Sequence, residues 1–151
     1  MPGRRTHVAV GLAAGVAVGA VSASFLPEEQ RLIEVAAAAL GGMIGGAMPD
    51  VLEPATSPNH RGVCHSVVAG SAIATGLFIH VRADCQARAR DCDARATLNP
   101  VGSEVRSNEE LKACLWRALG AITLGVAAGY ASHVLLDAQT SDGVPLIVRG
   151  L

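Results

Sequence analysis

The chain has 151 residues, half of them apolar, and a formal net charge of −1 at pH 7. This length suffices for one domain with a buried core, so we expect a single domain over residues 1–151. Only 3% of the residues are aromatic, whereas 17 are glycine, a composition that suits helices packed closely through small side chains. A near-neutral chain without a basic stripe and interleaved aromatics excludes nucleic acid as an expected partner.

Four apolar segments of helical length follow one another along the chain, at 6–26, 32–48, 63–81 and 115–138. β-Branched residues do not dominate them, and proline is confined to ends and loops. We therefore predict an all-α fold, a four-helix up-down bundle. Ser107 and Glu110 form a capping box, which predicts that the last helix begins near Asn108 and ends near Asp137.

A charged stretch at 82–106 separates the third and fourth apolar segments. Because it is mixed in sign and poor in large apolar residues, we predict a polar insert, either a surface loop or a partly helical excursion without a core of its own. Cys85 and Cys92 lie in this insert. The chain has no CxxC pair, which argues against a zinc ribbon, and a disulfide between these two cysteines stays open.

The apolar segments have the length and composition of membrane helices. A helix needs about 20 mainly apolar residues to cross a hydrocarbon core of about 30 Å; segments one, three and four meet this, and segment two is shorter. Glycines recur at small-xxx-small spacing, which lets membrane helices approach, at Gly11, Gly15 and Gly19, at Gly41 and Gly45, and at Gly125 and Gly129. We predict a transmembrane, multi-pass protein of the cell membrane. Because Ala and Gly contribute little insertion energy, a soluble Ala-rich bundle is the alternative.

The N-terminal segment also has features of a signal peptide. Arg4 and Arg5 precede an apolar run, and small residues follow at 21–23. Cleavage would remove His7, so we expect the segment to be retained.

Polar residues are concentrated where the predicted helices begin and end. In an up-down bundle the start of helix one, the end of helix two, the start of helix three and the end of helix four share one end. His133 and Asp137, four residues apart, lie on one helix face. Imidazole and carboxylate are zinc ligands. The four histidines and two aspartates at this end exceed the four ligands of a closed structural site, which favours an open or dinuclear catalytic centre. The alternative is a set of buried, hydrogen-bonded histidines. The residues that converge are His7, Asp50, Glu53, His60, Arg61, His65, His133 and Asp137.

Three ordered motifs carry a family resemblance. MPD at 48–50, HRGVCHS at 60–66 and GYASHVLLDAQTSDGVPL at 129–146 resemble motifs of the membrane-bound, metal-dependent hydrolases, also called LexA-binding, inner-membrane-associated hydrolases. The resemblance spans all four helices but not the insert, and it implies a helical hydrolase of the bacterial inner membrane. It places six residues in the metal site: His7, Asp50, His60, His65, His133 and Asp137.

The chain departs from the family motifs at two positions. Leu52 stands where the family has the second aspartate of PDxD, and Glu53 follows it. Either Glu53 substitutes for that aspartate from a shifted loop, or one metal position is weakened. Cys64 stands where the family usually has threonine, and we expect a small buried thiol there rather than a metal ligand.

The expected function is metal-assisted hydrolysis of a phosphoester or ester, with a lipid-linked substrate favoured by the membrane location. One or two divalent ions, Zn²⁺ or else Mn²⁺ or Fe²⁺, would lower the pKa of water, and Asp50 or Glu53 would accept its proton. Arg61 would hold an anionic substrate, or else pair with a nearby acid. Ser66 is expected to be a helix-start hydroxyl. Expected partners are membrane lipid and an anionic small-molecule or lipid-linked substrate. A non-catalytic metal-binding or transport protein and a structural helical membrane protein are the rival classes.

Overall fold

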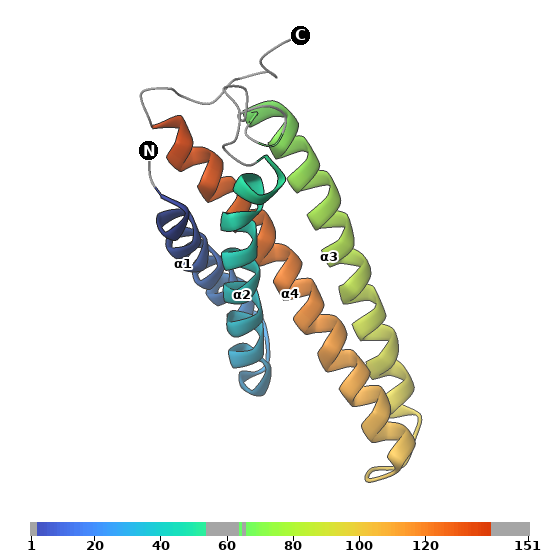
Figure 1. The fold of residues 1–151 in the computed structure, drawn as a ribbon. Coiled ribbons are helices and arrows are strands. Elements are labelled where there is room, and N and C mark those ends of the chain that lie inside the picture. The colour runs from blue at the N-terminus through green and yellow to red at the C-terminus, as the bar shows by residue number, and fades with distance from the viewer. Residues whose placement is uncertain (1–2, 54–63, 65, 140–151) are drawn as a thin grey trace.

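The computed structural model describes residues 3–53, 64 and 66–139, which form four helices in up-down order (Figure 1). The helices are α1 (Arg4–Ala23), α2 (Glu28–Leu52), α3 (Val67–Thr97) and α4 (Glu104–Ala138). The predicted all-α fold class is confirmed. The start of α1, the end of α2, the start of α3 and the end of α4 lie at one end of the molecule (Figure 1), as the predicted topology requires.

The second helix is longer than expected. It runs for 25 residues and not only over 32–48, because Glu28 and Glu29 occupy its first turn and it continues through Pro49 to Leu52. Acidic side chains in a first turn are favourable next to the positive end of the helix dipole. The expectation that this segment is too short to cross a bilayer is therefore wrong.

The fourth helix begins earlier than expected, at Glu104. Gly102 has a φ of 79°, a left-handed conformation that ends the preceding turn, and the Ser103 side chain then accepts a hydrogen bond from the Arg106 amide. Ser103 is thus the N-cap. The predicted cap at Ser107 is wrong, because its amide already donates to the Ser103 carbonyl within the helix.

Glycines bring three helix backbones into direct contact, with α2 between α1 and α4. A Cβ atom on Gly42 would lie 2.2 Å from the Gly11 carbonyl oxygen of α1, and one on Gly41 would lie 2.0 Å from the Ile122 carbonyl oxygen of α4. Neither position can hold a larger residue without moving a backbone. The small-xxx-small pattern therefore packs α1, α2 and α4 together, as predicted.

Large apolar side chains lie on the outside of this core. Ala38, Ala113 and Ala121 are fully buried, whereas Leu32 is 79% exposed and Leu135 is 64% exposed. A soluble bundle would have the opposite arrangement, with its large apolar groups inside. Among the described helices, α1, α2 and α4 are long and apolar enough to cross a membrane. Both observations favour the transmembrane prediction over the soluble bundle.

The charged stretch after the third apolar segment is mostly helical. Residues 82–97 continue α3, and Cys85, Ala89, Cys92 and Ala96 are all buried, at alternating spacings of four and three residues. This stripe of small residues packs on α4, so the prediction that the insert has no core of its own is wrong. Small side chains are sufficient to form this buried contact because α3 and α4 lie close together.

The positions of Cys85 and Cys92 along α3 exclude a disulfide between them. Cys85 and Cys92 lie two turns apart on one helix, about 10.5 Å along its axis, which is beyond the reach of a disulfide. Both thiols are free.

The third helix is attached differently from the other three. Among the described helix pairs, the backbone of α3 contacts α4, whereas α1, α2 and α4 all contact one another. The hairpin formed by α3 and α4 extends well beyond the turn that joins α1 to α2 (Figure 1). The molecule is therefore a glycine-packed group of three helices with a projecting helical hairpin.

Candidate metal centre

Side chains from three helices converge at the end where α1 begins and α4 ends. His7 comes from the first turn of α1, Asp50 from the last turn of α2, and His133 and Asp137 from the last turns of α4. His133 is fully buried, His7 is 3% exposed and Asp137 is 4% exposed. Ligand atoms of His7, Asp50 and His133 all lie within 4.8 Å of one another, so these three residues form a group that could hold a metal ion.

The nitrogen and oxygen atoms of the cluster are evenly spaced. The Nε2 atom of His133 lies 3.6 Å from Oδ1 of Asp50 and 3.5 Å from Oδ2 of Asp137, and Nε2 of His7 lies 3.4 Å from Oδ1 of Asp137. The two imidazole rings stack, with centroids 3.8 Å apart and planes inclined by 22°. Both rings therefore turn Nε2 towards the same carboxylate.

These separations match a metal shell better than a hydrogen-bonded cluster. An ordinary N–H···O hydrogen bond spans about 2.7 to 3.2 Å between heavy atoms. Ligand atoms placed tetrahedrally at bond lengths of about 2.0 to 2.2 Å lie about 3.3 to 3.6 Å from one another. The three separations fall in the second range, and the donor set of imidazole and carboxylate suits a divalent ion.

The backbone of α2 fixes the orientation of His133. Its Nδ1 atom lies 2.8 Å from the Gly46 carbonyl oxygen, and a carbonyl oxygen can only accept, so Nδ1 carries a hydrogen, and in the neutral imidazole Nε2 presents its lone pair to the cluster. Gly46 also lets α1 approach, since a Cβ atom there would lie 2.4 Å from the His7 carbonyl oxygen. One glycine thus positions both histidines.

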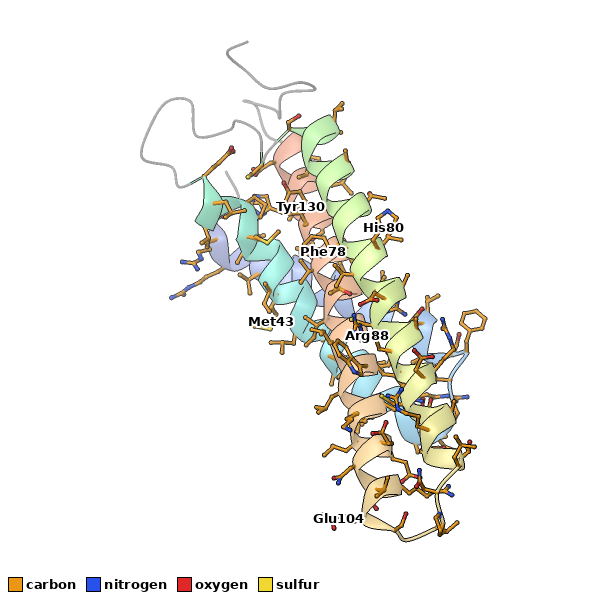
Figure 2. The ribbon with its side chains drawn as sticks, turned by 90° about the vertical axis from the view of Figure 1, so that its right-hand side faces the viewer. Met43, Phe78, His80, Arg88, Glu104 and Tyr130 are labelled. Carbon is orange, nitrogen blue, oxygen red and sulfur yellow. The ribbon has the colours of Figure 1, made fainter. Side chains whose placement is uncertain are left out.

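Cys64, which lies between α2 and α3, is attached to this end by two further contacts. The Cys64 amide donates to Oε1 of Glu53 at 3.0 Å, and the Tyr130 hydroxyl of α4 donates to the Cys64 carbonyl. Tyr130 is buried between the helices (Figure 2). Sequence reasoning gave Tyr130 no role, although it lies in the motif that contains His133; its position next to that histidine was the available signal.

Three residues singled out in the sequence, Glu53, Cys64 and Ser66, have the following positions. Glu53 lies at the C-cap of α2 and is not part of the three-residue ligand group, so its role as general base stays a prediction. Cys64 is half-buried and not fully buried as expected, and burial, followed by the Glu53 carboxylate, raises the pKa of its thiol, which favours the protonated thiol over a thiolate ligand. Ser66 directly precedes α3, and its carbonyl accepts from the Gly70 amide, as expected for a residue at a helix start. His80 is exposed on α3 and points away from the other helices (Figure 2).

The remaining predicted site residues, His60, Arg61 and His65, lie outside the described residues. Their predicted roles as two metal ligands and a substrate-binding arginine therefore stay predictions.

The fold and this cluster define a class: a helical membrane protein with a buried His/Asp group at one end of its helices. The particular family follows from the sequence, which matches the YdjM inner membrane protein family over residues 1–148. The chain belongs to this family, which is also known as the LexA-binding, inner-membrane-associated hydrolases, and the resemblance found in the motifs is confirmed. It is accordingly an inner membrane protein. No curated protein and no solved structure matched the chain.

Proposed function

We propose that this protein is a membrane-associated, metal-dependent hydrolase that cleaves a phosphoester or ester bond. The observation that supports the proposal most directly is the spacing of the buried cluster, where two Nε2 atoms and two carboxylates are separated by 3.4 to 3.6 Å. His7, Asp50, His133 and Asp137 would hold the ion, with His60 and His65 as further ligands. A divalent ion bound there, Zn²⁺ or else Mn²⁺ or Fe²⁺, would lower the pKa of water towards neutrality and polarise the bond to be cleaved.

The residues around the cluster have separate tasks in this proposal. Asp50 is half-buried, whereas Asp137 is almost fully buried, so Asp50 is the carboxylate that a substrate and its attacking water can approach. Asp50 accepts the proton of that water, and Glu53, three residues further on, is the second candidate. The Gly46 carbonyl keeps His133 in the tautomer that a ligand needs.

An anionic, lipid-linked substrate fits the location of the cluster. Its residues lie within the first or last turns of α1, α2 and α4, at the boundary between the apolar helix surfaces and the loops. A headgroup bond of a lipid lies at this depth in a membrane. Arg61 would bind the negative charge, because a guanidinium presents a planar fork of donors to a phosphate. No role for nucleic acid is proposed.

The distribution of ligands favours hydrolysis over metal transport. A transport path would need ligand groups along the helices, whereas in the part of the chain that the structure describes the ligand group lies at one end. A non-catalytic metal-binding protein is the second candidate, since the same cluster would serve it equally well.

The test uses purified protein in detergent, with metal content measured by elemental analysis and hydrolysis measured on aryl phosphoesters and on ester and phosphoester lipids. We expect hydrolysis that disappears on chelation and returns with one of the three divalent ions. Asp50→Asn should lower metal content and hydrolysis together. Glu53→Gln should keep the metal, and it should lose hydrolysis only if Glu53 is the base.

Two results would contradict the proposal. Metal binding without hydrolysis of any of these substrates would favour the non-catalytic alternative. Protein that binds none of the three ions when folded would leave only a structural role for the cluster.

A further inference from the structure

A second buried polar cluster joins all four helices far from the metal centre. The Ser22 hydroxyl of α1 donates to Oε1 of Glu34 at 2.6 Å, and Arg82 of α3 donates to Ser22, to Glu34 and to the Gly120 carbonyl of α4 at 2.7, 3.1 and 3.0 Å. Ser22 lies about 22 Å along α1 from His7. This cluster is therefore separate from the proposed hydrolytic site and shares no residue with it.

A recess beside this cluster carries more arginines than carboxylates. It has a volume of about 220 Å³, and the charged residues in its wall are Glu34, Arg82, Arg90, Asp93 and Arg117. Arg82 pairs with Glu34 at 3.1 Å, and Arg117 pairs with Asp93. Arg90 is exposed and has no ion-pair partner among the described residues. The recess thus has one uncompensated positive charge.

An apolar groove leads into the recess. It has a volume of about 440 Å³, and Ala17, Val18, Val21 and Leu124 form its apolar wall. Ser22 and Arg82 line both the groove and the recess, so the two are continuous. The apolar groove along α1 and α4 therefore ends at a group of guanidinium side chains.

The recess lies at the level where the helices leave the membrane. α1 ends at Ala23, directly after Ser22, and α2 begins at Glu28. Trp116, the one tryptophan of the chain, precedes Arg117, and the Arg88 guanidinium lies 5.0 Å from its ring centroid. Tryptophan is enriched at membrane–water interfaces. The arginines therefore lie at the depth of lipid headgroups, and the groove lies at the depth of the acyl chains.

We infer that the groove and recess bind one anionic phospholipid. The acyl chain lies along Ala17, Val18, Val21 and Leu124, and the phosphate accepts hydrogen bonds from Arg90 and from Arg82 or Arg117, whose guanidinium groups each have further N–H donors. A neighbouring recess between α2 and α4 carries Glu29 and Glu110 in addition to Glu34 and Asp93. Glu34 and Asp93 line both recesses and are paired with Arg82 and Arg117. Glu29 and Glu110 line the second recess only and repel a phosphate there, so the headgroup binds on the side of α1 and α3.

Native mass spectrometry of the whole protein, released from detergent, tests this inference. The protein is titrated with phosphatidylglycerol and with phosphatidylcholine of the same acyl composition. We expect phosphatidylglycerol to be retained more tightly. Arg90→Gln should weaken its retention about fivefold, the effect of one basic residue at a membrane surface. Arg88→Gln is the matched control, because Arg88 is an exposed arginine of the same helix that does not line the recess, and it should leave retention unchanged.

The groove is tested separately with Val18→Trp, which fills it and should reduce retention of both lipids. Equal retention of the two lipids by the wild type would overturn the inference. An equal loss in the Arg88 and Arg90 variants would also overturn it, because general surface charge would then explain the binding. Full competition by glycerol phosphate, which lacks acyl chains, would show an anion site without a lipid and would likewise overturn it. Circular dichroism checks that each variant is folded.

Discussion

The imidazole of His133 is held from three sides. Its Nδ1 atom contacts the Gly46 carbonyl, its ring stacks on His7, and its Nε2 atom lies 3.5 Å from Asp137 and 3.6 Å from Asp50. The residue is fully buried, so its nitrogen is fixed with respect to both carboxylates. This rigidity is what a preorganised metal ligand requires.

We therefore expect His133→Ala to remove a ligand and to leave two carboxylates facing each other without it. Loss of a residue that only supports a ligand lowers metal affinity about 10- to 100-fold. Loss of the ligand His133 should lower metal affinity, and with it metal content, at least as far. Hydrolysis should fall in parallel. Elemental analysis of the folded variant and an activity assay measure both quantities.

The chain supplies a control in His80, an exposed histidine that points away from the other helices (Figure 2). His80→Ala should leave metal content and activity unchanged. If the His133 variant kept a full complement of metal, the ligand group would be incorrect. If both variants lost metal equally, general destabilisation would be the cause.

At the scale of the helices, packing depends on glycines that face neighbouring backbones. A Cβ atom on Gly125 of α4 would lie 1.9 Å from the Ala38 carbonyl oxygen of α2, whereas one on Gly76 of α3 would meet no atom within 4 Å. The same substitution should therefore have opposite effects in the two helices.

We expect Gly125→Ala to destabilise the protein by about 1 to 3 kcal/mol, the usual effect of overpacking. Gly76→Ala should be neutral or stabilise by up to about 1 kcal/mol, because alanine has the higher helix propensity. Thermal unfolding in detergent measures both. A Gly125 variant as stable as the wild type would mean that α2 and α4 are less closely packed than described.

At the scale of the whole molecule, positive charge is distributed unequally between the two ends. Of the ten Lys and Arg residues that the structure describes, two belong to the end with the metal centre, namely Arg4 and Arg5. The other eight belong to the α1–α2 turn and the projecting hairpin, namely Arg31, Arg82, Arg88, Arg90, Arg95, Arg106, Lys112 and Arg117. Segments rich in Lys and Arg stay on the cytoplasmic side of a membrane.

We therefore predict that the hairpin is cytoplasmic and that the metal centre faces the periplasm. Alkaline phosphatase fused after Leu151 should be active, since it requires export, and green fluorescent protein fused there should be dark. The same reporters inserted in the turn between α3 and α4 should give the reverse pattern. Fluorescence from the C-terminal fusion would show the opposite orientation and would place the proposed hydrolysis in the cytoplasm.

The sequence by itself determined the helical class, the family and the gathering of His7, Asp50, His133 and Asp137 at one end. Helix length and up-down order are enough to place residues at an end, because each helix rises by a fixed distance per residue. The small-xxx-small glycines likewise predicted close packing, because glycine has no side chain to hold backbones apart.

Only the tertiary structure decided which helices those glycines join and how the polar insert folds. Ala89 and Ala96 form a buried stripe because α4 lies against them, and a pattern of small residues among charges does not reveal that contact in advance. Ser103 and Ser107 could each begin a helix, and the left-handed turn at Gly102 selects the first. The orientation of His133 likewise depends on the Gly46 carbonyl, 87 residues away, which no local pattern can show. Contacts between distant segments determine these features, since a local sequence fixes only the conformations and faces that a segment can offer.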